Sequence, residues 1–217
     1  MSYSGVVTPG GPAATRELSA LILTKVSVGP MDNNAYLLEC RATGDLTLVD
    51  AANDAAALLS LVDGRPLQQV VTTHRHRDHW VALEEVVSAT GASTVAGAAD
   101  ADGIPVATDR PVSDGDVVEV GQVRLEVIHL VGHTPGSVAL LYEDPSGTAH
   151  VITGDSLFPG GPGRTTNPAD FTSLMDDLEA KVFGRLPDDT WFYPGHGNDS
   201  TLGAERPHLG EWRARGW

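Results

Sequence analysis

Three histidines and one aspartate lie within six residues of this chain, between an apolar segment and an amphipathic one. The stretch "THRHRDH", residues 73–79, holds His74, His76, Asp78 and His79. Residues 67–73, which lead into it, have the length and β-branched content of a strand, and residues 81–91 have helical periodicity. Because alternate side chains after a strand can point into one cavity, this cluster predicts a turn that can present imidazoles and a carboxylate to more than one metal ion.

Three further segments have a common form, in which an apolar strand ends and a glycine-flanked histidine or aspartate follows. They are "LVGHTPGS" with His133, "VITGDSLF" with Asp155 and "FYPGHG" with His196. A single histidine in a glycine-rich turn is more often a hydrogen-bonded turn residue than a ligand. Ligands bind beyond strand ends in αβ sheets, however, so four such ends can converge on one site. Imidazole and carboxylate without cysteine suit zinc, iron or manganese.

The rest of the chain alternates between strand and helix patterns. We expect strands at 20–28, 34–40, 46–51, 93–97, 137–143, 150–155 and 190–194, and a hairpin over 117–130 that turns at Gly121 and Gln122. Residues 53–64 predict a helix with Asn53 as N-cap and Gly64 just past its end. Residues 167–184 predict the clearest helix, capped by Asn167 and ended by Gly184.

Two halves of similar layout, with helices between strands, predict sheets covered by helices. No linker divides the chain, so we expect a single domain over residues 1–217. The glycine- and proline-rich residues up to about 16 are expected to be a mobile lead-in.

Composition restricts the possible partners. The formal net charge is -15, and Lys25 and Lys181 are the only lysines. No basic stripe is available to follow a phosphate backbone, so nucleic acid is not an expected partner.

Cys40 is the single cysteine, which excludes a disulfide framework and predicts a buried, inert thiol. No segment reads as a signal peptide or approaches the ~20 apolar residues of a membrane span, so we expect a cytoplasmic protein, and the abundant Ala, Gly and Arg favour a bacterial, GC-rich genome.

The set "THRHRDH", "GHTPGS", "TGDSLF" and "PGHG" resembles the successive motifs of the metallo-β-lactamase superfamily, in their usual order. The resemblance implies an αββα sandwich, of the α/β (α+β) class, with two divalent metal ions at one edge of the paired sheets. It implies that His74, His76 and His133 hold the first ion and that Asp78, His79 and His196 hold the second. Asp155 would bridge the two, and His129, His150 and His208 would be supporting or surface residues.

Within the superfamily the chain is most similar to the glyoxalase II group, which hydrolyses thioesters of a carrier thiol. It departs from that group at Trp80 and Val81, where Gly-Gly is frequent, and at Thr166, where Asp is common. About twenty residues follow "PGHG", so we expect no counterpart here of the helical region that grips glutathione in larger members. The resemblance therefore supports the reaction class better than the identity of the thiol.

The resemblance implies that two ions, zinc before iron or manganese, acidify a bridging water to hydroxide and polarise the carbonyl under attack. Asp78 and Asp155 would orient this nucleophile. No general acid is needed because a thiolate leaves without obligatory protonation. The neighbours of the motifs predict a substrate pocket lined by Trp80, Phe158, Arg164 and Tyr193.

Three alternatives remain open from the sequence. One is an iron-dependent persulfide dioxygenase, in which residues matching His74, His133 and Asp155 would hold a single iron. Another is a different metallohydrolase, such as a lactonase or a β-lactamase. A non-catalytic binding module is the third.

Overall fold

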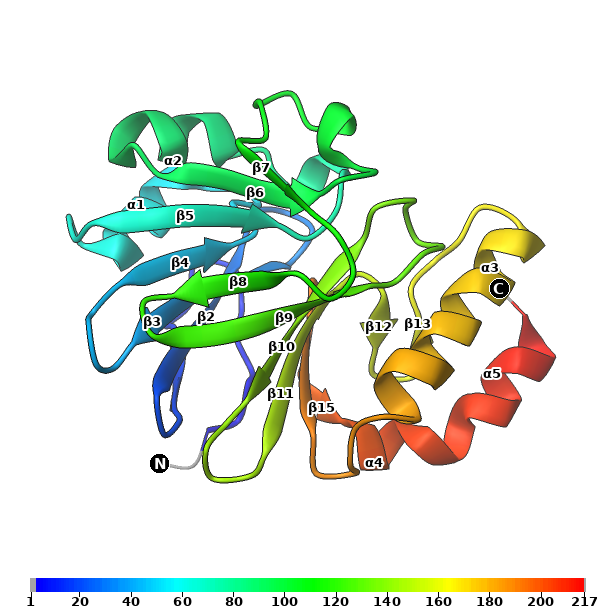
Figure 1. Cartoon of the computed structure of the whole chain (residues 1–217). Helices are drawn as coiled ribbons and strands as arrows, with labels where there is room; N and C mark the ends of the chain where they lie inside the picture. Colours follow the sequence, from blue (N-terminus) through cyan, green and yellow to red (C-terminus); the bar gives the residue numbers. More distant parts are fainter. Residues whose placement is uncertain (1–2, 217) are drawn as a thin grey trace.

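The computed structural model describes residues 3–216 as two β-sheets packed face to face, with helices on both outer faces (Figure 1). Seven strands form the first sheet in sequence order: β1 (Ala14–Glu17), β2 (Leu21–Val28), β3 (Asn33–Cys40), β4 (Leu46–Val49), β5 (Leu67–Thr72), β6 (Ser93–Gly97) and β7 (Arg110–Val112). Strands β1 to β4 are antiparallel, and β4 to β7 are parallel.

Six strands form the second sheet, in the order β15-β14-β11-β10-β9-β8. Their bounds are β8 (Val117–Val120), β9 (Val123–His129), β10 (Val138–Glu143), β11 (Ala149–Gly154), β14 (Trp191–Pro194) and β15 (Ser200–Thr201). A separate two-stranded hairpin, β12 (Leu157–Phe158) and β13 (Gly161–Pro162), lies beside this sheet.

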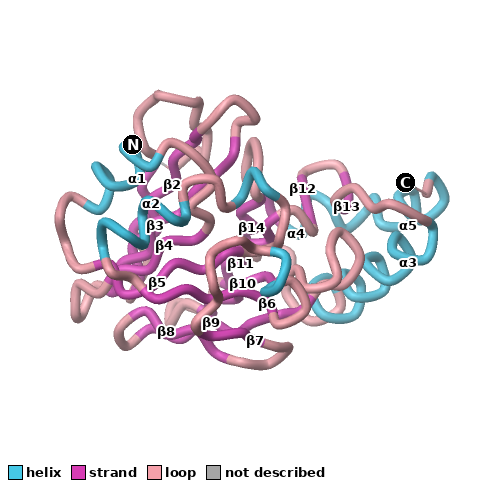
Figure 2. Tube along the Cα trace, turned by 90° about the horizontal axis from the view of Figure 1, so that it is seen from above, coloured by secondary structure: helices cyan, strands magenta, loops and turns pink. Residues whose placement is uncertain are grey.

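The helices cover the two outer faces, as the view from above shows (Figure 2). Helices α1 (Ala55–Val62) and α2 (Leu83–Thr90) pack on the first sheet, and α3 (Pro168–Asp177), α4 (Leu202–Glu205) and α5 (Leu209–Arg215) lie with the second. Buried apolar side chains form three layers. One lies between α1 and α2 and the first sheet, one between the two sheets, and one between the second sheet and α3, α4 and α5. The predicted αββα sandwich is therefore confirmed.

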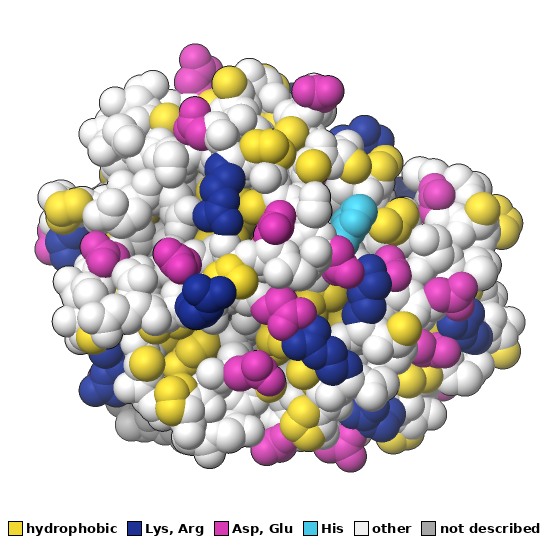
Figure 3. Space-filling model, in the orientation of Figure 1, with side chains coloured by type: hydrophobic (Ala, Val, Ile, Leu, Met, Phe, Trp, Pro, Cys, Tyr) yellow, Lys and Arg dark blue, Asp and Glu magenta, His cyan; other side chains and the backbone are white. Residues whose placement is uncertain are grey.

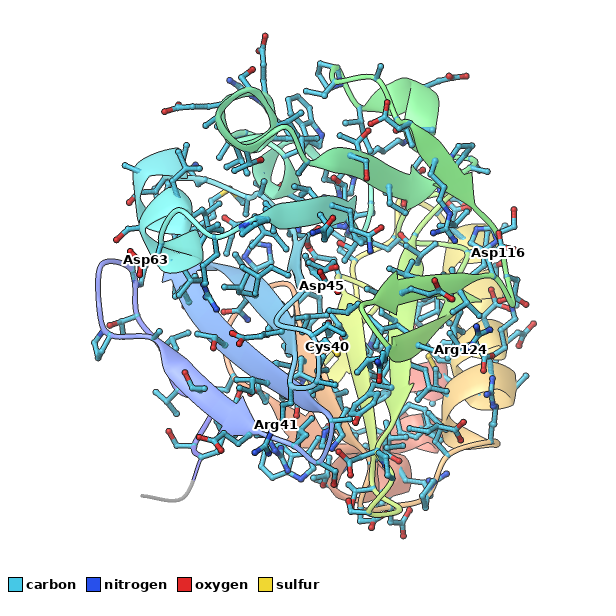
Figure 4. The ribbon with its side chains drawn as sticks, turned by 60° about the vertical axis from the view of Figure 1, so that its left-hand side comes forward. Cys40, Arg41, Asp45, Asp63, Asp116 and Arg124 are labelled. Atoms are coloured by element: carbon cyan, nitrogen blue, oxygen red, sulfur yellow. The ribbon has the colours of Figure 1, made fainter. Side chains whose placement is uncertain are left out.

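The first helix begins and ends one residue inside its predicted bounds. Asp54, and not Asn53, is the N-cap, because its side chain accepts a hydrogen bond from the amide of Ala57 at 3.2 Å. Asp63, and not Gly64, is the C-cap and adopts the left-handed conformation with φ 55°; it lies at the end of α1 (Figure 4). Aspartate tolerates this conformation better than most residues, so the glycine is not required at the cap.

The clearest predicted helix is present. Asn167 caps it by accepting a hydrogen bond from the amide of Asp170 at 2.9 Å. Its later part, Leu178–Phe183, widens into π-helical turns before Gly184. The strands β1, β7, β12, β13 and β15 and the helices α4 and α5 were not predicted, because each is too short to give a periodic pattern.

The expected mobile lead-in has contacts in this structure. The hydroxyl of Tyr3 donates to Asp199 at 2.7 Å, and its ring meets Trp191 edge to face with 6.2 Å between centroids.

Cys40 is buried, as predicted. Among residues 3–216, no helix combines the length and the apolarity that crossing a bilayer would demand.

Candidate metal centre

Seven histidine and aspartate side chains from four separate segments meet at one edge of the paired sheets. The turn after β5 supplies His74, His76, Asp78 and His79, the loop between β9 and β10 supplies His133, and the ends of β11 and β14 supply Asp155 and His196. They form three overlapping groups, in each of which the potential ligand atoms lie within 4.8 Å of one another. The sequence predicted all seven, and the structure brings them together.

One group consists of three imidazoles. Nδ1 of His76 lies 2.9 Å from Nε2 of His133, which lies 3.3 Å from Nε2 of His74. A neutral imidazole carries one acceptor nitrogen. Three imidazole rings that converge in this way, with no donor side chain between them, match the way in which histidines surround a metal ion.

A second group contains Asp78, His79 and His196. Oδ2 of Asp78 lies 3.2 Å from Nε2 of His196 and 3.5 Å from Nε2 of His79. The same oxygen accepts a hydrogen bond from Nδ2 of Asn33 at 2.9 Å, which fixes the carboxylate between the two rings.

Asp155 lies between the two groups. Its Oδ1 is 3.3 Å from Nε2 of His79, and its Oδ2 is 3.5 Å from Nε2 of His196 and 3.7 Å from Nε2 of His133. One carboxylate thus reaches imidazoles of both groups, which is the placement that a bridging ligand requires.

Two buried atoms of this cluster have no hydrogen-bond partner. They are Nε2 of His79 and Oδ1 of Asp155, which lie near each other without hydrogen-bonding geometry. A buried polar atom left without a partner costs roughly 1–3 kcal/mol. Metal ions would satisfy both atoms, so the residues fit a metal centre.

The opposite ring nitrogens are fixed by hydrogen bonds outside the cluster. Nδ1 of His79 is 2.8 Å from Oδ2 of Asp50, Nδ1 of His133 is 2.7 Å from the carbonyl of Arg164, and Nδ1 of His196 is 2.9 Å from the carbonyl of Met31. Each acceptor favours the tautomer that protonates Nδ1, and this leaves Nε2 free to bind a metal ion.

Asp50 and Asp100 support the centre and were not identified from the sequence. Asp50, at the end of β4, also accepts hydrogen bonds from the amide and the hydroxyl of Thr73, at 2.7 and 2.8 Å. Asp100 accepts hydrogen bonds from the amide of Arg75 at 3.0 Å and the amide of Gly136 at 2.9 Å, and so joins the "THRHRDH" turn to the "GHTPGS" loop. The signal that could have identified Asp50 is its position, an acidic residue at the end of the strand-like "LTLVD".

Glycine is required beside the ligands because the backbone approaches them closely. A Cβ on Gly195 would lie 2.1 Å from Oδ1 of Asp155 and 2.7 Å from Cε1 of His79. A Cβ on Gly163 would lie 1.6 Å from the carbonyl oxygen of Asp155. The glycines of the motifs therefore allow the strand ends to converge.

The electrostatics of the cluster favour a bound cation. Burial lowers the pKa of His74 and of His133, so both rings are neutral and available as ligands. Burial opposes charge on His196 too, but hydrogen bonds to Asp155 and Asp78 raise its pKa to about 10. The two carboxylates thus attract positive charge, which a divalent ion can supply in place of a proton.

Two of the four predicted pocket residues line a cavity beside the cluster. Phe158 and Arg164 border a space of about 350 Å³ that also touches His133 and Asp155. A second cavity, of about 330 Å³, touches Asp78 and presents the exposed side chain of Met31.

The other two predicted pocket residues lie elsewhere. Tyr193 is completely buried between the sheets, with its hydroxyl 2.9 Å from Nδ1 of His150, so its assignment to the pocket was wrong. Strand alternation explains the error, because β14 directs Tyr193 into the core. Trp80 packs partly buried against the core beneath α1 and α2, and its Nε1 donates to the carbonyl of Arg75 at 2.9 Å.

The remaining histidines lie outside the cluster. Nε2 of His129 is 2.8 Å from the carbonyl of Pro135, which shapes the loop that carries His133. His150 is bonded to Tyr193, and His208 is exposed, 3.5 Å from Glu211. These supporting and surface positions agree with the expectation from the sequence.

Paired sheets between helices, with a His/Asp cluster at one sheet edge, define a metal-binding αββα protein of the hydrolase type. The sequence model of the metallo-beta-lactamase superfamily matches residues 28–196, and the chain belongs to this superfamily. The clusters described above can bind metal ions, of which members of this fold usually hold two.

Relatives of known sequence and structure resemble the chain over most of its length. A hydroxyacylglutathione hydrolase of Polaromonas sp. is 37% identical over 76% of this chain, and the match spans 62% of that relative, less than two thirds of it. TTHA1623, solved in a di-iron-bound form, is 33% identical over 84% of this chain and 96% of its own, with a TM-score of 0.70. ETHE1 from Myxococcus xanthus is 29% identical over 86% of this chain and 82% of its own, with a TM-score of 0.74.

Proposed function

We propose that the protein hydrolyses an acyl thioester of a carrier thiol, in the manner of glyoxalase II, with two divalent metal ions. The observation that carries the proposal is the position of Asp155, whose two oxygens face imidazoles of both ligand groups. The identity of 37% to a hydroxyacylglutathione hydrolase supports this reaction over the other hydrolyses considered from the sequence.

The ligand sets divide the seven residues between two ions. His74, His76 and His133 would hold one, Asp78, His79 and His196 the other, and Asp155 would contact both. Two divalent ions held there would supply Lewis acidity, which polarises a carbonyl oxygen and makes water a nucleophile near neutral pH. We assign zinc first because nitrogen and carboxylate ligands suit it; the di-iron form of TTHA1623 keeps iron as the alternative.

The side chains of the chain would position the reactants. Asp78 and Asp155 accept hydrogen bonds and would orient the attacking water. Asn33 holds Oδ2 of Asp78 through a hydrogen bond of 2.9 Å, so this carboxylate is already aligned. A thiolate is a good leaving group, so no proton donor is required at the sulfur.

A small molecule is the partner that the surface favours. The net charge is -15, and charged side chains of both signs are interspersed on the face shown in Figure 3. Phosphate-backbone binding needs clustered cations. The cavities of about 350 and 330 Å³ are of a size that suits small ligands.

The test is a substrate panel with protein reconstituted separately with zinc, iron and manganese. Thiol release from S-lactoylglutathione is compared with hydrolysis of a lactone and a β-lactam and with oxygen uptake on glutathione persulfide. We expect thioester hydrolysis to be the fastest of these reactions. Persulfide-dependent oxygen uptake by the iron form, without thiol release from the thioester, would replace the hydrolase with the dioxygenase.

A further inference from the structure

A further cavity, called the polar cavity below, lies at the end of β11 opposite to the metal centre. Its volume is about 370 Å³. Its lining includes Arg16, Arg41, Asp144, Ser146, Thr148 and His150. His150 is the second residue of β11, and Asp155 directly follows the same strand. The two positions are therefore separated by roughly 16 Å of strand, at about 3.3 Å per residue. The polar cavity is thus distinct from the metal centre.

Arg16, on β1, is held in place by aromatic side chains. Its Cζ lies 4.1 Å from the centroid of the Trp191 ring, and its Nη1 donates to the hydroxyl of Tyr193 at 3.1 Å. Stacking fixes the plane of the guanidinium and leaves N–H donors at its edge. Glu17 also borders the cavity, but successive side chains of β1 point to opposite faces, and that of Glu17 is exposed. Arg16 therefore keeps donors that Glu17 does not occupy.

Arg41 is held against the turn between β1 and β2. Its Nη1 donates to the carbonyl of Leu18 at 2.8 Å, and its amide donates to the carbonyl of Ala20 at 2.9 Å. The side chain lies at the lower end of the molecule in Figure 4. A guanidinium has five N–H donors, so most of those of Arg41 remain available to a ligand in the polar cavity.

His150 presents an N–H donor to the same cavity. Burial, followed by the charge of Arg16, lowers the pKa of His150 to about 4, so the ring is neutral near pH 7. The buried hydroxyl of Tyr193 accepts from Arg16 and lies 2.9 Å from Nδ1 of His150. Because a guanidinium can only donate, the phenol hydrogen is left for Nδ1, and Nε2 carries the ring hydrogen.

The Nε2 donor of His150 is buried and unpartnered. The residue is 3% exposed and lines the polar cavity. Among residues 3–216 its hydrogen-bond partner is Tyr193, at the other ring nitrogen. The two nitrogens of an imidazole point in nearly opposite directions, so Nε2 points away from Tyr193 and toward the cavity. A buried donor without a partner is costly, and an acceptor group in the cavity would remove this cost.

The one buried carboxylate of the cavity is already satisfied. Asp144 accepts hydrogen bonds from the amides of Ser19 and Ser146, at 2.8 and 2.7 Å, and from the hydroxyls of Ser19 and Tyr142. Its oxygens are therefore not available to Arg16 or Arg41. The cavity thus offers two guanidinium groups and an imidazole N–H, in a chain whose net charge is -15.

We propose that the polar cavity binds the phosphate group of a small phosphate monoester. The donors come from three separate segments, at Arg16, Arg41 and His150, and Thr148 adds a hydroxyl. Donors that converge from several sides match the three terminal oxygens of a phosphate monoester better than the two oxygens of a carboxylate. The volume of about 370 Å³ leaves room for a small organic group beside the phosphate.

The test is a titration of zinc-loaded protein with inorganic phosphate and with phenyl phosphate at constant ionic strength. Binding is followed in long-range proton–nitrogen correlation spectra of the imidazole rings, in which the His150 signal is identified by its loss in His150→Asn. We expect the free protein to show His150 protonated at Nε2. Both compounds should then shift this signal until it saturates.

Two substitutions separate the contributions of the donors. Arg41→Met should raise the Kd for phosphate about 10-fold or more, as expected for the loss of a charged hydrogen-bond donor, and Arg41→Lys should restore part of the affinity. Thr148→Val, which removes a neutral donor, should raise the Kd by about 5-fold. Arg41 is exposed, so its replacement should leave the fold intact.

Arg124→Met is the matched control for the loss of a positive charge. Arg124 is exposed on β9, pairs with Glu119 at 3.2 Å and lies outside the polar cavity (Figure 4). It should retain the wild-type Kd. An equal loss of affinity in Arg124→Met and Arg41→Met would reduce the effect to net charge and overturn the proposal.

Four other results would also overturn the proposal. One is an unchanged Kd in Arg41→Met, and another is a shift confined to the histidines of the metal centre, which would place phosphate there. The third is the same shift with chloride. The fourth is tighter binding of acetate than of either phosphate compound, which would assign the cavity to a carboxylate.

Discussion

Nδ1 of His79 lies 2.8 Å from Oδ2 of Asp50, and both side chains are buried. This pair turns Nε2 of His79 toward Asp155 and Asp78. Burial opposes a charge on His79, but the carboxylates of Asp50 and Asp155 raise its pKa well above the usual range. Asp50 therefore makes the ring more basic and would make it a stronger ligand for a metal ion, without being in the ligand groups itself.

Replacement of Asp50 should weaken metal binding without removing a ligand. We expect Asp50→Ala to lower the affinity for the more weakly held ion by about 10–100-fold, the usual loss when the hydrogen-bond partner of a ligand is removed. Competition with a chromogenic chelator measures this affinity. Asp144→Ala, which removes a buried carboxylate far along the chain, is the control; equal affinities in the two variants would show that the Asp50 contact is only structural.

Loss of His196 should separate the two ligand groups. The three imidazoles of the first group do not include His196. We expect His196→Ala to keep roughly one metal ion per chain and to lose thioester hydrolysis by about 100-fold or more, the loss expected when one of two catalytic metals is displaced. Elemental analysis and steady-state hydrolysis are measured together, with His129→Ala as the variant that should keep both ions. Full activity in His196→Ala would argue for a centre with a single ion.

The seven candidate ligands were predictable because each lies in a local motif, in which a strand end and neighbouring glycines indicate its position. Asp50, Asn33 and Asp100 lie far from these motifs in sequence, so only the folded chain shows that they support the ligands. Tyr193 has a different explanation. It lies next to a motif in the sequence, but the alternation of side chains along β14 directs it into the core and away from the pocket.

The buried pair of Lys25 and Asp199 should be important for stability. Nζ of Lys25 is 2.6 Å from Oδ1 of Asp199, and both side chains are fully buried. Nζ also donates to the carbonyls of Gly5 and Gly197, at 2.9 and 2.8 Å. Lys25→Met would leave the carboxylate buried without its cation and should lower the free energy of unfolding by about 3–5 kcal/mol.

Urea denaturation of the Lys25→Met variant measures this loss. The double variant Lys25→Met/Asp199→Asn removes both charges and should be less destabilised than the sum of the single variants. Additive losses would mean that the two charges do not interact appreciably.

His150 should contribute to the pH dependence of the free energy of unfolding. Burial, with a smaller contribution from the charge of Arg16, lowers the pKa of His150 to about 4. The unfolded chain, with a pKa near 6.5, binds a proton that the folded chain excludes, so stability falls as the pH drops from about 6.5 toward 4. Between about pH 7 and pH 5 this amounts to roughly 2 kcal/mol.

His150→Asn keeps a polar partner for Tyr193 and removes the titrating ring. Urea denaturation of both proteins at about pH 7 and pH 5 isolates the contribution, because every other group is shared. Between these two pH values, the free energy of unfolding of the variant should fall by about 2 kcal/mol less than that of the wild type. Identical losses would show that His150 is not kept neutral by the fold.

The most direct test of the dinuclear thioesterase is a titration of metal-free protein with zinc, followed by the rate of S-lactoylglutathione hydrolysis. The seven ligand residues and the bridging position of Asp155 predict that the rate rises until about two ions are bound per chain and then stays constant. A chain that takes up less than about half an ion, or that binds about two ions and releases no thiol at any occupancy, would contradict the account.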